Sequence, residues 1–224
     1  MTRYFMTNTL LAGVEVLMML PPGFQPRGGG IFARHKYTPA DCDCGYCQRT
    51  EKKKQPCAGA AKCVCFDERL TAGCWTLGEL AECLAKEIAI GKLTGRTRRL
   101  LPPRTSSPFR DEAHLKRMTA MTAAATMRES NPYAAAVFLL SADPILWMKS
   151  RQAIRSGSID FNKASARGVG LDGYTLLQTA KDLYLGGSRL TTEELCDRQI
   201  VGDELFRLIV SAFVIRRYGL PVIL

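Results

Sequence analysis

The sequence has few of the residues from which most active sites are built. Its two histidines, His35 and His114, lie far apart. It contains neither a Gly-x-Ser-x-Gly motif nor a glycine-rich phosphate-binding loop. Nucleophilic hydrolysis and phosphoryl transfer therefore lack their usual sequence signatures. These absences predict a protein that is not an enzyme.

Long hydrophobic runs are also missing. The apolar stretch near the N-terminus is interrupted by Glu15, and no small-residue cleavage site precedes Pro21 and Pro22. The stretch is far shorter than the ~20 residues that span a bilayer. We therefore expect a short buried element here, no membrane partner, and a cytoplasmic protein, in which structural disulfides are rare.

Acidic residues are scarce relative to basic ones, and the formal net charge is +10. Residues 1–130 carry 20 Lys and Arg against 12 Asp and Glu, whereas residues 131–224 carry 11 against 9. Excess positive charge favours anionic partners such as nucleic acid. The sequence assigns such a partner to the N-terminal half of the chain.

Cysteine, by contrast, is concentrated: six of the nine lie in residues 42–65. Structural zinc is held by four ligands, and the Cys-x-x-Cys step of this segment lets two sulfurs of one tight loop reach the same ion. Four thiolates leave no open coordination position, so the site would be structural and not that of a metalloenzyme. The predicted zinc ligands are Cys44, Cys47, Cys57 and Cys63, with Cys42 or Cys65 as substitutes.

Other interpretations of the cysteines stay open. An iron–sulfur cluster uses similar spacings, and the thiols could also be unligated. His35 could replace one sulfur, although an exposed loop residue is the simpler interpretation. Cys83 and Cys196 stand apart from the cluster and are expected to be small core residues, and Cys74 is left open.

Two segments carry most of the basic residues that we expect to contact phosphate. One is the loop between the predicted ligand pairs, where lysines could instead offset the negative charge of a thiolate site. The other is residues 91–110, which contain three prolines, two serines and no acidic residue, a composition typical of a linker. The predicted nucleic-acid contacts are Arg49, Lys52, Lys53, Lys54, Arg96, Arg98, Arg99 and Arg104.

Helix-capping signals follow the cysteines. Thr76 and Glu79 form a capping box that predicts a helix over residues 76–90. Asp143 followed by proline predicts the start of another helix, and Thr191 with Glu194 forms a second capping box. Sequence signals after residue 110 are all helical. We therefore expect a mainly α fold, with a small N-terminal zinc-knuckle module followed by an α-helical bundle.

These signals divide the chain into three parts. Residues 1–90 form the Cys-rich zinc-binding module with one packing helix, residues 91–110 the basic Pro-rich linker, and residues 111–224 the all-α bundle. Residues 190–210 have the spacing of a helix-turn-helix motif. The helix that follows is apolar on nearly every side, whereas a recognition helix needs polar side chains for the bases. Two core helices are therefore the favoured interpretation.

Three stretches of the helical part are NPYAAAVFLLSADPILW, GYTLLQTAKDLYLG and LTTEELCD…LFRLIVSAFVIRRYG. They resemble a family of uncharacterised Cys-rich accessory proteins of phages and integrative mobile elements of Gram-positive gut bacteria. In that family a Cys-rich segment also precedes the helical domain, here CDCGYCQ…CAGAAKCVC followed by FDERLTAGC. The resemblance implies a mobile-element context and supplies no site residues.

Two functions follow as hypotheses. The first is a non-enzymatic, zinc-stabilised accessory protein of a mobile element that binds nucleic acid or a nucleoprotein through its basic N-terminal half. The second is a protein inhibitor of a host defence nuclease, of the anti-CRISPR type, which acts by protein–protein contact.

Overall fold

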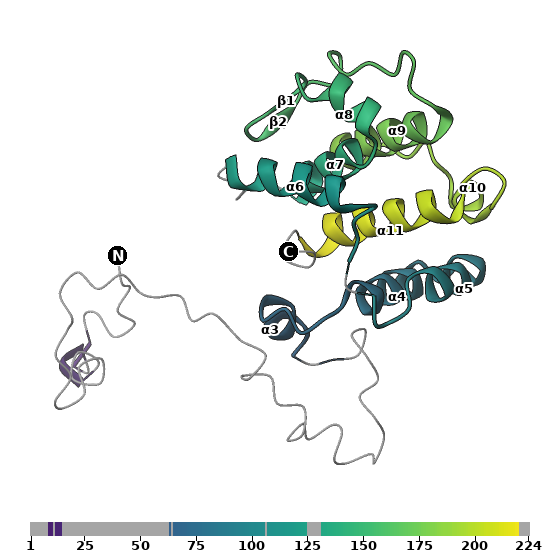
Figure 1. The fold of residues 1–224 in the computed structure, drawn as a ribbon. Coiled ribbons are helices and arrows are strands. Elements are labelled where there is room, and N and C mark those ends of the chain that lie inside the picture. The colour runs from purple at the N-terminus through teal and green to yellow at the C-terminus, as the bar shows by residue number, and fades with distance from the viewer. Residues whose placement is uncertain are drawn as a thin grey trace. The chain divides into compact units, whose positions relative to one another are not determined.

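The structure is a computed structural model that describes residues 9, 10, 12–14, 63, 65–105, 107–124 and 131–219 (Figure 1). Its chain divides into two compact units, Met1–His35 and Lys36–Leu224. Within the first unit, residues 12–14 are helical. Of the predicted zinc-binding module over residues 1–90, the packing helix is described, whereas residues 15–62, which hold four of the six clustered cysteines, lie outside the described residues.

The second unit is mainly helical, which confirms the predicted fold class at this level. Its elements in chain order are α3 (Phe66–Thr71), α4 (Leu77–Ile88), α5 (Gly91–Leu100), α6 (Glu112–Ala124), α7 (Asn131–Ala142), α8 (Pro144–Ser150), β1 (Ile154–Arg155), β2 (Ser158–Ile159), α9 (Leu171–Leu185), α10 (Thr192–Cys196) and α11 (Asp203–Tyr218). The two short strands pair antiparallel, with Ile154 opposite Ile159.

The core is built around α7. Every residue of this helix from Tyr133 to Ala142 is buried, as expected for a helix that is apolar on all sides. It packs chiefly against α9 and α11, and also against α6 and α8. The hydroxyl of Ser141, a buried polar residue of this helix, donates to the carbonyl oxygen of Phe138 at 3.0 Å, which satisfies its hydrogen-bonding need locally.

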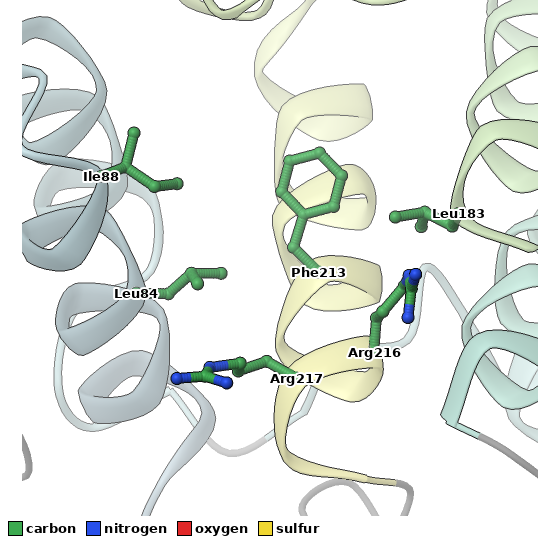
Figure 2. Close-up of a pocket in the computed structure, with 6 residues that line it drawn as sticks. All are labelled: Leu84, Ile88, Leu183, Phe213, Arg216 and Arg217. Atoms are coloured by element: carbon green, nitrogen blue, oxygen red, sulfur yellow. The ribbon is translucent and has the colours of Figure 1, made fainter. Parts of the chain in front are cut away.

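Helix α11 joins two layers of the unit. It packs against α7 and α9 on one side and against α4 and α5 on the other (Figure 1). Its inward residues include Phe206, Ile209 and Val214, so the prediction that this helix belongs to the core is confirmed. Between α4, α9 and α11 an open groove remains (Figure 2).

The predicted helix starts are confirmed by their hydrogen bonds. Thr76 and Thr191 each form a complete capping box, and the carboxylate of Asp143 accepts from the backbone N–H of Leu146 at 2.7 Å. Each bond satisfies a backbone donor that the first turn of a helix leaves free. At the end of α11, Gly219 is the C-cap.

The predicted linker over residues 91–110 is wrong for its first ten residues, which form α5. This helix buries Leu93, Arg96 and Thr97, positions that share one face of a helix. The inward face could not be recognised from composition, because two of its three buried residues are polar and the partners of Arg96 lie about a hundred residues further along the chain.

The turn after α5 is also held in place. The Thr76 hydroxyl bonds to the carbonyl oxygen of Pro103, and the backbone N–H of Gly78 donates to the Thr105 carbonyl at 3.2 Å. A Cβ atom on Gly78 would lie 1.9 Å from the carbonyl oxygen of Pro102. Glycine is therefore required at this position for the turn to rest on the start of α4.

Candidate nucleic-acid interface

Helix α5 places its basic residues on two different sides. Leu93, Arg96 and Thr97 face the interior, whereas Lys92, Arg98 and Arg99 are exposed. Lys92 and Arg99 are exposed on the same face of the helix because they are seven residues, or about two turns, apart. The sequence could not separate these roles, because all four side chains are cationic.

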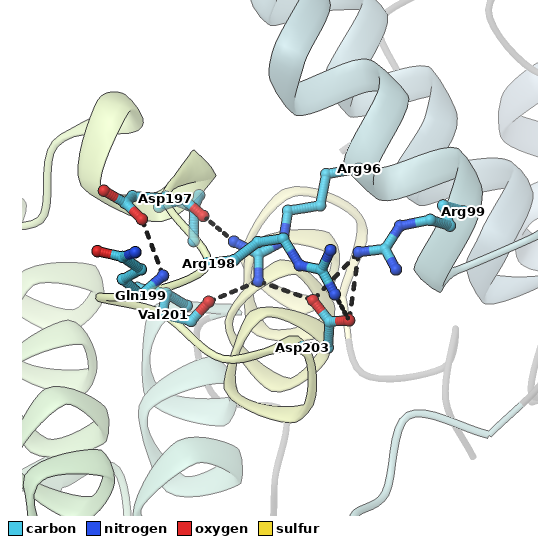
Figure 3. Close-up of polar contacts among 8 residues, drawn as sticks. Arg96, Arg99, Asp197, Arg198, Gln199, Val201 and Asp203 are labelled. Carbon is cyan, nitrogen blue, oxygen red and sulfur yellow. Dashed lines mark hydrogen bonds and ion pairs between the residues drawn. The ribbon is translucent and has the colours of Figure 1, made fainter.

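Arg96 is buried, with 7% of its surface exposed, and all its contacts are internal (Figure 3). Its guanidinium group donates to the carbonyl oxygens of Leu195 at 2.8 Å and Val201 at 2.5 Å, and to the carboxylate of Asp203 at 3.0 Å. It also lies 4.3 Å from the ring centroid of Phe206, a favourable cation–π arrangement. The prediction that Arg96 contacts nucleic acid is therefore corrected: both terminal nitrogens of its guanidinium donate inside the protein, and the side chain ties α5 to the start of α11.

Asp203 is the centre of a cluster of three arginines (Figure 3). Besides Arg96, it accepts from Arg99 at 3.1 and 3.2 Å and from Arg198 at 3.1 Å. The hydrogen bond from Arg99, followed by that from Arg96, lowers the pKa of Asp203 below its ordinary value. Three guanidinium groups share one carboxylate, which leaves two positive charges in excess at this point of the surface.

A second carboxylate on the neighbouring helix is also shared by two cations. Glu82 of α4 accepts from Arg98 at 2.8 Å and pairs with Lys86 at 3.1 Å. The hydrogen bond from Arg98 contributes most to lowering the pKa of Glu82. Arg98 and Lys86 remain 59% and 49% exposed, so both are accessible to a partner. Exposed pairs of this kind contribute little to stability, typically ~0–1 kcal/mol.

These two clusters define the surface that we call the α5 face, made of Lys86, Lys92, Arg98, Arg99 and Arg198. Arg198 was not predicted, because it follows α10 in the half of the chain with nearly balanced charge. No motif marks it as basic surface: Arg198 contacts Asp203 five residues further on, and the long-range contacts of Asp203 with Arg96 and Arg99 bring it to α5. Arg104, which was predicted, is exposed in the turn after α5.

The remaining predicted contacts, Arg49, Lys52, Lys53 and Lys54, lie outside the described residues. The same holds for Cys42, Cys44, Cys47, Cys57 and His35.

Cys63 is the one predicted zinc ligand within the described part of the chain. It is half-buried and packs against the core, and its sulfur lies 4.0 Å from Nη1 of Arg69. Over the described ranges, no three His, Cys, Asp or Glu residues come close enough together to hold a metal ion.

Two cysteines outside the cluster, Cys83 and Cys196, lie in helices α4 and α10. Cys83 is buried at 5% exposure, as predicted for a core residue. Cys196 is half-buried, and burial raises the pKa of its thiol. A raised thiol pKa makes this side chain less reactive than an exposed cysteine.

His114 is fully buried and has an internal role. Its Nδ1 accepts from the backbone N–H of Arg110 at 3.1 Å, and its Nε2 lies 2.9 Å from the Phe138 carbonyl oxygen. An amide can only donate and a carbonyl can only accept, so the ring is neutral with its proton on Nε2. Burial is the main cause that lowers the pKa of His114 to about 4. The residue holds the start of α6 on α7.

No protein-family model, curated protein sequence or solved structure matches this chain. Of the helices that the structure describes, none has both the length and the apolar character needed to cross a bilayer.

Proposed function

We propose that this chain is a non-enzymatic accessory protein of a mobile element that binds nucleic acid through its basic surface. The observation that supports this proposal best is the α5 face, where four of the five cationic side chains share two carboxylates, one of them also paired with the buried Arg96. Arg99 and Arg198 lie side by side on Asp203, so a phosphate can approach both guanidinium groups while Arg96 continues to neutralise the carboxylate. Such phosphate contacts are independent of base sequence.

The proposal predicts weakly sequence-dependent binding that falls steeply with salt, because each neutralised phosphate releases counterions. We expect the double variant R99E/R198E to bind a random-sequence duplex at least about tenfold more weakly at low salt. The slope of log affinity against log salt should become shallower by about 2, since about 0.9 is expected for each phosphate contact on duplex DNA. Fluorescence anisotropy with labelled duplex and single strands measures both quantities.

The matched control is R151E/R167E, which makes the same charge change at two exposed arginines outside the α5 face. This variant should retain most of the affinity. Absence of binding to either probe at low salt, or an equal loss in the control, would show that the α5 face does not bind nucleic acid.

We further propose that zinc stabilises the segment before α3, with Cys44, Cys47, Cys57 and Cys63 as ligands and Cys42 or Cys65 as substitutes. The proposal rests on the spacing of the clustered cysteines; Cys63, a free thiol three residues before α3, is the one of these four ligands that lies within the described residues. Metal binding of this kind contributes to folding itself, on the order of 10 kcal/mol in small zinc modules.

Elemental analysis of the purified full chain should give one zinc per molecule, and C63A should lower this content. C196A is the matched control, since Cys196 is the last residue of α10 and lies outside the cysteine cluster. Its zinc content should equal that of the wild type. If the protein is metal-free, stays compact and does not respond to a chelator, the zinc proposal is wrong. The proposal that the α5 face binds nucleic acid would be unaffected by that result.

A further inference from the structure

The groove between α4, α9 and α11 is separate from the α5 face and has a different character. It has a volume of about 420 Å³ and is lined by Leu84, Ile88, Leu183, Phe213, Arg216 and Arg217. Phe213 forms the floor, with Leu84 and Ile88 on one side and Leu183 on the other (Figure 2). Ile88 remains 41% exposed, so the groove is open to solvent.

Two arginines of the last turn of α11 border this apolar floor. Arg216 extends toward α9 and Arg217 toward α4 (Figure 2). Arg217 pairs loosely with Glu87 at 3.6 Å, and its side chain is 60% exposed. Arg216 is half-buried and makes no ion pair with any residue that the structure describes. A half-buried cation beside apolar walls is best satisfied by an anionic group from outside.

We infer that this groove binds an acidic amphipathic helix of a partner protein. Apolar side chains of such a helix, spaced at i, i+3 or i+4 and i+7, would enter the space above Phe213. Glutamate or aspartate side chains on its flanks would pair with Arg216 and Arg217. The groove has room for a few aliphatic side chains, so the backbone of the partner helix would stay outside it.

Charge and shape both favour this occupant over the alternatives. A nucleic acid would supply phosphates for the arginines but little apolar surface to cover the four apolar residues of the lining. A small ligand usually has most of its surface buried in its pocket, which a groove open along Ile88 and Arg217 does not provide. An acidic amphipathic helix supplies apolar side chains for the apolar residues of the lining and carboxylates for its two arginines.

The inference goes beyond nucleic-acid binding and supplies a surface for the protein–protein contact of the alternative function. The test starts by panning a displayed library of random 14-residue peptides against the full-length protein. We expect the enriched peptides to be acidic, with apolar residues at helical spacing. One enriched peptide, labelled with a fluorophore, is then titrated with the wild-type protein and its variants.

We expect R216E and I88E each to weaken binding of this peptide at least about tenfold. Both place a negative charge against an acidic peptide; R216E also removes a cation, and I88E also removes an apolar contact. The matched controls are R151E and I145E, which make the same changes at exposed positions on or next to α8, and these should bind as the wild type does. A peptide with lysines in place of its acidic residues should bind R216E better than it binds the wild type. Circular dichroism establishes that each variant is folded.

Several outcomes would overturn the inference. Enrichment of no peptides, or of basic ones, excludes an acidic partner, and insensitivity to both R216E and I88E excludes the groove. Peptide binding that appears only after residues 220–224 are deleted would assign the groove to the chain's own segment. A dimer that R216E converts to a monomer would assign it to a second copy. Binding of oligonucleotides should be unchanged in R216E, so failure here is distinguishable from failure of the α5 face.

Discussion

Replacing Arg96 with methionine is expected to lower the free energy of unfolding by about 3 kcal/mol, because two buried carbonyl oxygens each lose a partner at a cost of about 1–3 kcal/mol. Methionine retains the aliphatic volume but removes the donors to Leu195 and Val201, whose carbonyl oxygens lose their partner. It also removes the guanidinium from the ring of Phe206. Asp203 keeps Arg99 and Arg198, so its charge is not left unpaired. Chemical denaturation followed by circular dichroism measures the change.

The matched control is R99M, which removes another arginine from the same carboxylate. Arg99 is 49% exposed, so its loss should cost within ~1 kcal/mol, as exposed ion pairs do. For nucleic-acid affinity we expect the opposite order. R99M should bind more weakly than the wild type, and any loss of affinity in R96M should follow from its lower stability. Equal destabilisation by the two variants would contradict the structural role assigned to Arg96.

Acidification should destabilise the protein through His114. The pKa of this residue falls from its ordinary 6.5 to about 4 in the folded state, so the unfolded chain binds the proton more readily. The stability that comes from this difference is complete above pH 6.5 and is lost as the pH falls toward 4. The loss over this window should be about 3 kcal/mol.

The H114Q variant separates this effect from the titration of carboxylates. Glutamine can still donate to the Phe138 carbonyl but does not titrate, whereas the neighbours Asp111, Arg110 and Arg117 are unchanged. The stability difference between wild type and H114Q, measured by denaturation from pH 7 to 4, should shift by about 3 kcal/mol against the wild type. Parallel pH profiles would show that His114 does not titrate as expected.

Local signals in the sequence predicted much of the helical unit. The capping boxes at Thr76 and Thr191 and the cap at Asp143 mark helix starts because their hydrogen bonds involve residues three positions away. The burial of α7 and α11 follows from apolar residues on all sides of each helix. These features need no knowledge of the tertiary structure.

The functional surfaces depend on contacts that no local pattern contains. Helix α5 was missed because Arg96 faces inward, and its acceptors lie about a hundred positions further along the chain. Arg198 joins the α5 face only through Asp203. The groove requires three helices from distant parts of the chain to meet. Sequence composition therefore identified the basic region but not which of its arginines are accessible.

The contacts of Arg96 span 99 to 107 positions of the chain, and this has a consequence for how the polypeptide can be divided. A fragment beginning at residue 111 would retain α6 to α11 but would expose the Phe206 ring and two main-chain oxygens to water. Helix α5 can pack on the start of α11 only after nearly the whole domain has been synthesised, because the partners of Arg96 lie about a hundred residues further along the chain. Contacts between residues this far apart in sequence also form slowly. The α5 face is therefore completed only when α5 has packed on the start of α11.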